Sequence, residues 1–131
     1  RFADRLRVAL PGSAEIPAVW VPSLILQPLV ENAVVHGLAD HQGPVFVRIT
    51  VCIEHDRLIL RVHNTIAPGK LTGEEGIGLR NVRERLAVQF EGRSGLAAAG
   101  VDTEWVSEIM MPAIREAPSR ETRHEAVLVA T

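Results

Sequence analysis

The chain has 131 residues, of which 47% are hydrophobic and 23% charged, enough for one globular domain with its own core. The formal net charge is -2 and the basic residues are spread along the chain, which argues against a nucleic-acid-binding domain. The single cysteine, Cys52, excludes an internal disulfide and favours a reducing, cytoplasmic setting. No stretch approaches the roughly 20 apolar residues of a membrane span. Because the chain begins with Arg1 rather than Met, we expect a piece of a longer protein.

The first expected elements are a short strand and a helix. Charged and apolar residues alternate over residues 1–10, which predicts a strand ended by Pro11-Gly12. Residues 24–38, LILQPLVENAVVHGL, predict a helix with Ser23 as its N-cap. Its apolar side holds Leu26, Leu29, Val30, Ala33 and Val34, and its polar side holds Gln27, Glu31, Asn32 and His36. A carboxylate, two amides and an imidazole suit a ligand, and a core helix that merely turns these groups to solvent is the alternative.

A β-hairpin is expected next. Residues 45–54 alternate between apolar and mostly polar positions, and residues 57–64 return with Leu58, Leu60 and Val62 on the inner face. Continuing by twos from Val62 places Asn64 on that same face. A buried amide there needs a partner, since leaving it unpaired costs roughly 1–3 kcal/mol. The alternative is a turn-initiating Asn that bonds its own backbone.

The second half predicts a loop, a helix and another hairpin. Residues 65–75 lack apolar periodicity, and Gly76-Ile77-Gly78 then opens a helix whose backbone N–H groups can approach an anion. A flexible start of a helix is the alternative for this glycine pair. The helix has an apolar stripe of Leu79, Val82, Leu86 and Phe90, with Arg80, Asn81, Glu84 and Arg85 outward. Residues 95–100 and 103–111 predict a hairpin, so helices should pack on one face of a mixed sheet. Residues 113–131 read as a charged linker or tail.

This order of motifs resembles the ATP-binding domain of the GHKL superfamily. LQPLVENAVVHG and GIGLRNVRERL look closely like the LytS/YehU-type sensor histidine kinases, over about residues 1–112. The resemblance implies an α+β two-layer sandwich of the Bergerat type, a mixed and mostly antiparallel sheet with helices on one face. ATP would lie between helices and sheet under a lid formed by residues 65–75.

The resemblance also implies roles for individual residues. Asn32 would coordinate the Mg²⁺ that bridges the phosphates, and Glu31 would polarise the attacking group. Asn64 stands where most of the family has an Asp that reads the adenine amino group, and its oxygen can accept the same hydrogen bond. Backbone amides at Gly76 and Gly78 would meet the phosphates. The remaining nucleotide-binding positions implied are His36, Lys70, Ile77 and Leu79.

Some positions depart from the family or have a second interpretation. Val35 replaces a common Lys, and Glu74 replaces the first glycine of GxGIGL. For Lys70 a solvated loop lysine is the alternative, and for His36 a packed or hydrogen-bonded side chain is favoured over a metal ligand. Arg83 and Arg85 are expected on a solvated helix face.

The resulting hypothesis is the catalytic domain of a two-component sensor histidine kinase. It would transfer the ATP γ-phosphoryl group to a histidine on an upstream dimerisation segment, since none of the five histidines here has a matching context. A response regulator would be a partner, and the full-length protein would be a homodimer, with or without attachment to the inner membrane. Two alternatives remain: a degenerate, non-catalytic GHKL-fold interaction module, and a water-directed ATPase with Glu31 as general base.

Overall fold

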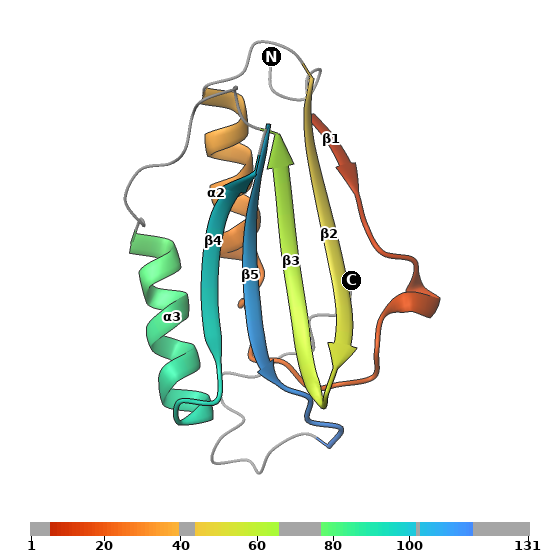
Figure 1. The fold of residues 1–131 in the computed structure, drawn as a ribbon, viewed down its shortest axis with the longest axis vertical. Coiled ribbons are helices and arrows are strands. Elements are labelled where there is room, and N and C mark those ends of the chain that lie inside the picture. The colour runs from red at the N-terminus through yellow and green to blue at the C-terminus, as the bar shows by residue number, and fades with distance from the viewer. Residues whose placement is uncertain (1–5, 40–43, 66–76, 102, 117–131) are drawn as a thin grey trace.

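A computed structural model describes residues 6–39, 44–65, 77–101 and 103–116. The expected loop 66–76 and the tail from residue 117 onward lie outside these ranges. The elements in chain order are β1 (Leu6–Ala9), the 3-10 helix η1 (Ser13–Glu15), α2 (Gln27–Ala39), β2 (Val45–Glu54), β3 (Arg57–Thr65), α3 (Ile77–Phe90), β4 (Gly95–Val101) and β5 (Glu104–Pro112) (Figure 1).

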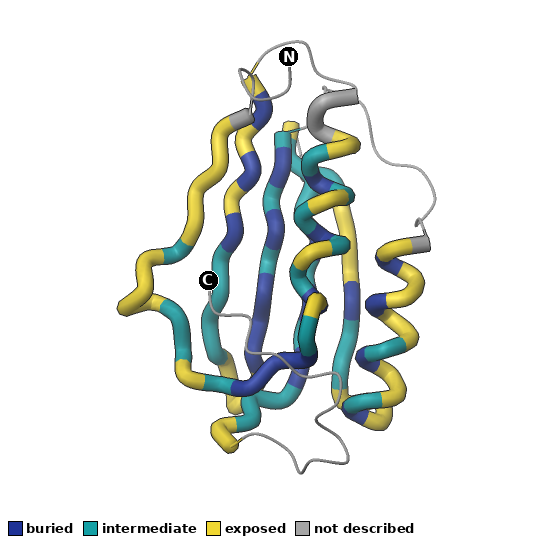
Figure 2. Tube along the Cα trace, turned by 180° about the vertical axis from the view of Figure 1, so that it is seen from behind, coloured by how far each residue is buried: buried dark blue, intermediate teal, exposed yellow. Residues whose placement is uncertain are grey.

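The five strands form one sheet in the order β1-β2-β3-β5-β4. β1 pairs with β2 in parallel, and the other three pairings are antiparallel. Both helices lie on the same face of this sheet (Figures 1 and 2). We call that face the core face and the opposite one the outer face. The expected α+β two-layer architecture with a mixed, mostly antiparallel sheet is confirmed.

The β2–β3 hairpin has the predicted strands and a two-residue turn. His55 and Asp56 both take positive φ, 52° and 63°, which is the conformation that matches the twist of antiparallel strands. Its alternation also holds, because Val45 and Val47 are buried while Phe46 and Arg48 are exposed. The side chains of this hairpin therefore face the sides that the sequence predicts.

The core lies between the helices and the sheet. α2 buries Leu29 and Ala33, and α3 buries its whole expected stripe of Leu79, Val82, Leu86 and Phe90. Near the end of α3, Phe90 meets Trp20 edge to face, with ring centroids 6.3 Å apart. Such a contact adds about 0.5–1.5 kcal/mol to the burial of the two rings. None of the described helices is long and apolar enough to cross a membrane.

Three boundaries differ from expectation. Of the strand expected over residues 1–10, residues 1–5 lie outside the described ranges, Leu6–Ala9 form β1, and Leu10 is not part of it. α2 begins at Gln27, so Ser23 is not its N-cap. Leu24 takes a left-handed φ of 56°, which the helical path cannot pass through. Thr65, expected in the loop, is the last residue of β3 because it pairs with Glu104.

Ordered contacts continue past Pro112 at the other end. Ala113 N–H donates to the Asp56 carbonyl, and Ile114 forms a bridge with Trp20. The domain boundary near residue 112 stays a prediction.

Candidate functional site

Asn64 is a buried polar side chain on the core face. It is 1% exposed, and its cross-strand neighbours are Val47 on β2 and Trp105 on β5. Its Nδ2 donates to the Thr65 carbonyl at 3.1 Å. Its Oδ1 has no hydrogen-bond partner among the described residues. The bond from Nδ2 to a neighbouring backbone carbonyl fits the alternative of an Asn that bonds its own backbone. It leaves Oδ1 without a partner within the described ranges, and a buried unsatisfied acceptor costs about 1–3 kcal/mol.

The polar side of α2 is as predicted. Gln27, Glu31 and His36 are exposed and Asn32 is half-buried, while the apolar side packs on the core. Gln27 Nε2 donates to Glu31 Oε1 at 2.8 Å, which holds the carboxylate along the helix axis. α2 therefore offers an oriented carboxylate beside an amide, both typical ligands of hydrated magnesium.

The start of α3 is the second part of the candidate site. Ile77 is its first residue and Gly78 is exposed, whereas Leu79 is 5% exposed and packs in the core. A Cβ added at Gly78 would lie 3.7 Å from the Pro28 Cβ, an ordinary contact. Packing alone does not require glycine there, and the unpaired N–H groups of a helix start attract anions. Lys70 and Gly76 lie outside the described residues.

Two arginines of α3 bond the backbone of other segments. Arg85 Nη2 donates to the Ser23 carbonyl at 2.6 Å, and Arg83 Nη1 donates to the Leu96 carbonyl at 2.8 Å. Arg83 is exposed, as expected for a solvated helix face, whereas Arg85 is half-buried, and each guanidinium also reaches a backbone carbonyl of another segment. The helical periodicity of α3 predicts the side of the helix on which each arginine lies, but not the groups that its long side chain contacts.

The structure places these parts on one side of the molecule. α2 packs against β2, β3 and α3, and the end of β3 that carries Asn64 lies near the C-terminal half of α2 (Figure 1). The start of α3 lies beside the first turn of α2, as the contact of Gly78 with Pro28 shows. The amide therefore lies toward one end of α2 and the start of α3 toward the other, with the polar side of α2 between them.

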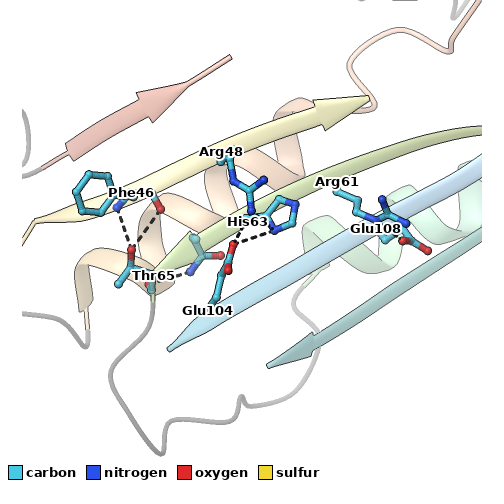
Figure 3. Close-up of polar contacts among 8 residues, drawn as sticks. Phe46, Arg48, Arg61, His63, Thr65, Glu104 and Glu108 are labelled. Carbon is cyan, nitrogen blue, oxygen red and sulfur yellow. Dashed lines mark hydrogen bonds and ion pairs between the residues drawn. The ribbon is translucent and has the colours of Figure 1, made fainter. Parts of the chain in front are cut away.

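A charged cluster lies on the outer face, next in sequence to Asn64. His63 Nδ1 is 2.9 Å from Glu104 Oε1 and 3.3 Å from Arg48 Nη2, and Arg48 itself lies 3.2 Å from Glu104 (Figure 3). Burial lowers the pKa of His63, with a further lowering from the Arg48 charge, against the opposing effect of Glu104. The sequence interpretation missed this cluster because it depends on the pairing of β3 with the distant β5.

Comparisons with known proteins place the chain in a family. No protein-family model matches the chain. The sensor histidine kinase YesM of Bacillus subtilis (strain 168) is 34% identical over 102 residues, covering 73% of this chain and 18% of YesM. The sensor histidine kinase YpdA of Escherichia coli (strain K12) is 33% identical over 101 residues, covering 69% of this chain and 18% of YpdA. The histidine kinase domain of the blue-light activated kinase EL346 of Erythrobacter litoralis shares the fold, with a TM-score of 0.61 at 18% identity over 83% of this chain and 55% of that one.

The sheet with helices on one face, the polar-sided helix and the glycine-opened helix define a GHKL-type ATP-binding domain. Within that class the chain belongs to the ATP-binding domains of the sensor histidine kinases, as its two motifs predict. It spans only 18% of the length of the curated relatives named above.

Proposed function

We propose that this chain binds ATP with Mg²⁺ and acts as the catalytic domain of a sensor histidine kinase. The observation that carries the proposal is the buried Asn64 Oδ1, a hydrogen-bond acceptor with no partner in the described part of the chain. It lies on the sheet face that the polar-sided helix α2 covers. A ligand that donates one hydrogen bond to this oxygen would satisfy it, and the adenine amino group is such a donor.

The orientation of the Asn64 amide supports this use. Because Nδ2 donates to the Thr65 carbonyl, the opposite end of the amide presents its oxygen. Rotating the amide to present NH₂ would break that bond and set Oδ1 against a carbonyl oxygen. The site is therefore arranged to accept a hydrogen bond, which suits adenine better than guanine, whose carbonyl occupies the same place.

The phosphate end would use α2 and the start of α3. Asn32 would offer its amide oxygen to a magnesium ion, which typically also takes phosphate oxygens and several waters. The described residues contain no group of three or more His, Cys, Asp or Glu that could hold a metal by themselves. This fits a metal held mainly by the nucleotide, with Gly76, Gly78 and Lys70 completing the phosphate contacts and His36, one helical turn from Asn32, at the rim.

The chemical role of the chain would be positioning and charge stabilisation. Glu31, held by Gln27, accepts a hydrogen bond from the attacking imidazole and makes its other nitrogen more nucleophilic. A nitrogen–phosphorus bond would then form as the bond between the γ-phosphorus and the bridging oxygen breaks; ADP would leave, and the proton of the other imidazole nitrogen would pass to Glu31. The acceptor histidine would belong to an upstream dimerisation segment, and a response regulator would receive the phosphoryl group. The full-length protein would be a homodimer whose catalytic domain lies in the cytoplasm, with or without attachment to the inner membrane.

Calorimetric titration with ATP, with and without Mg²⁺, tests the proposal. Wild type should bind more tightly with the metal, and Asn32→Ala should lose most of that difference while keeping the metal-free affinity. Gln89→Ala, which removes an amide from the far end of α3, is the matched control and should behave as wild type. Absence of binding at millimolar ATP would favour the non-catalytic module, and phosphate release without an acceptor histidine would favour the water-directed ATPase.

A further inference from the structure

Trp105 lies at the end of β5 on the core face. Along this strand Ser107, Ile109 and Met111 are buried, and side chains two residues apart point to the same face. Trp105 continues that series by one step toward the end of the sheet, where it is only half-buried. A large aromatic ring thus lies at the point where the core meets solvent.

The strand register places this ring beside the unsatisfied amide. Trp105 pairs with Asn64 across β3 and with Gly100 across β4. Directly opposite residues of antiparallel strands have Cβ atoms about 4.5–5.5 Å apart. Gly100 has no side chain, so the bicyclic ring has room on that side. The space over Asn64 on the core face, which we call the base slot, is flanked by Val47 on β2 and by Trp105 on β5.

We propose that Trp105 is a nucleotide-binding residue that stacks its indole ring against the adenine held by Asn64. This inference rests on the proposed function and extends it to a residue outside both sequence motifs. The indole offers a broad apolar face and a single N–H donor, so it adds contact area without reading the edge of the base. Asn64 selects the base by its hydrogen bond, and Trp105 holds a purine of either kind.

Burial of Asn64 explains why Trp105 should respond to the ligand. Because Asn64 is 1% exposed, a base reaches Oδ1 only if a neighbouring side chain moves. Val47 is itself 1% exposed in the core, whereas Trp105 is half-buried with solvent on one side. Of these two cross-strand neighbours, the indole is therefore the one with room to turn, and in the proposed binding mode it admits the base and then lies against it.

Fluorescence measures this directly, since the chain has two tryptophans. Trp20 is 4% exposed and packed on Phe90, so Trp20→Phe leaves Trp105 as the only emitter. ATP or ADP with Mg²⁺ should change the Trp105 emission saturably in this variant. The matched variant Trp105→Phe, which emits from Trp20 alone, should show no change on nucleotide addition.

Binding by the position 105 variants completes the test. Trp105→Ala should weaken ATP and GTP by the same factor of about tenfold, as expected for loss of one stacked base, and Trp105→Phe should stay within about threefold of wild type. Thermal unfolding checks that each variant is folded. Equal ATP affinity of Trp105→Ala and wild type, tighter binding by Trp105→Ala, or an unchanged Trp105 emission at saturation would overturn the role of Trp105 while nucleotide binding stands. If wild type binds neither ATP nor ADP by calorimetry, both this inference and the proposed function fail.

Discussion

Arg85 on α3 donates from Nη2 to the carbonyl of Ser23, which lies in the turn before α2, across 62 residues of sequence at 2.6 Å. This bond joins the two helices that would flank the nucleotide. Leu24, the next residue, takes a left-handed φ of 56°, so the backbone before Gln27 does not form a first turn of helix.

Arg85→Ala should lower the free energy of unfolding by about 1.5–3 kcal/mol, because a hydrogen bond from a charged donor is lost and a part-buried carbonyl loses its partner. Urea unfolding measures the change. Arg80→Ala, on the exposed side of the same helix, is the control and should stay within about 0.5 kcal/mol of wild type. Equal effects of the two substitutions would show that the Arg85 contact contributes nothing specific.

His63 should make stability depend on pH. Its folded-state pKa lies below the ordinary value of 6.5, chiefly through burial and then through Arg48, with Arg61 adding to the lowering and Glu104 opposing it. The unfolded chain therefore takes up the proton first. The contribution of neutral His63 to the free energy of unfolding is fully present above about pH 6.5 and is lost as the pH falls through the folded-state pKa. His63→Gln should flatten this part of the urea-unfolding profile, and superimposable profiles would contradict the assignment.

Gly78→Ala should change stability and binding in opposite directions. The added Cβ meets only an ordinary contact with Pro28, and alanine favours helix by up to about 1 kcal/mol, so thermal stability should rise or hold. The methyl group would keep the backbone from the phosphates, and we expect the Kd for ATP to rise about tenfold, a loss of about 1.4 kcal/mol. Gly95→Ala on β4 is the control for a tolerated methyl group, because the added Cβ would lie 3.7 Å from the Met110 Cε, also an ordinary contact. An unchanged ATP affinity for Gly78→Ala would remove Gly78 from the site.

Asn64→Asp should sharpen the preference for ATP over GTP by at most about tenfold, because a carboxylate cannot offer a donor to guanine. The same change should lower stability without nucleotide, since a carboxylate oxygen would replace the donor that now bonds the Thr65 carbonyl. Asn64→Leu removes both groups and should abolish the preference. A competition titration with both nucleotides measures the ratio of the ATP and GTP affinities. The same ratio for wild type, Asn64→Asp and Asn64→Leu would mean that residue 64 does not read the base.

Local patterns predicted much of the fold. Alternation over residues 45–54 and 57–64 gave both strands of the hairpin and the inward direction of Asn64, because strand parity depends only on the neighbouring backbone. The apolar stripe of α3 was predicted in full for the same reason. The sequence alone was sufficient to predict side-chain directions that follow from a period of two or 3.6 residues.

Contacts between distant segments were not predictable in this way. The Ser23 N-cap was wrong because Leu24 is left-handed, and neighbouring sequence does not predict the Arg85 bond to the Ser23 carbonyl from another helix. The pairing of Asn64 with Trp105 depends on β3 lying beside β5, which is not its neighbour in sequence. The residues that the sequence missed around the site all come from this pairing or from long side chains that cross between elements.

Thermal unfolding of this chain with and without ATP and Mg²⁺ tests the central claim most directly. A ligand that binds only the folded state stabilises it by about 2.7 kcal/mol at a hundredfold excess over its Kd, so saturating ATP with Mg²⁺ should raise the Tm by several degrees. The double variant with Asn32→Ala and Asn64→Leu should show little shift. An unchanged Tm of the wild type at millimolar ATP with Mg²⁺ would contradict the account of this domain as a nucleotide-binding one.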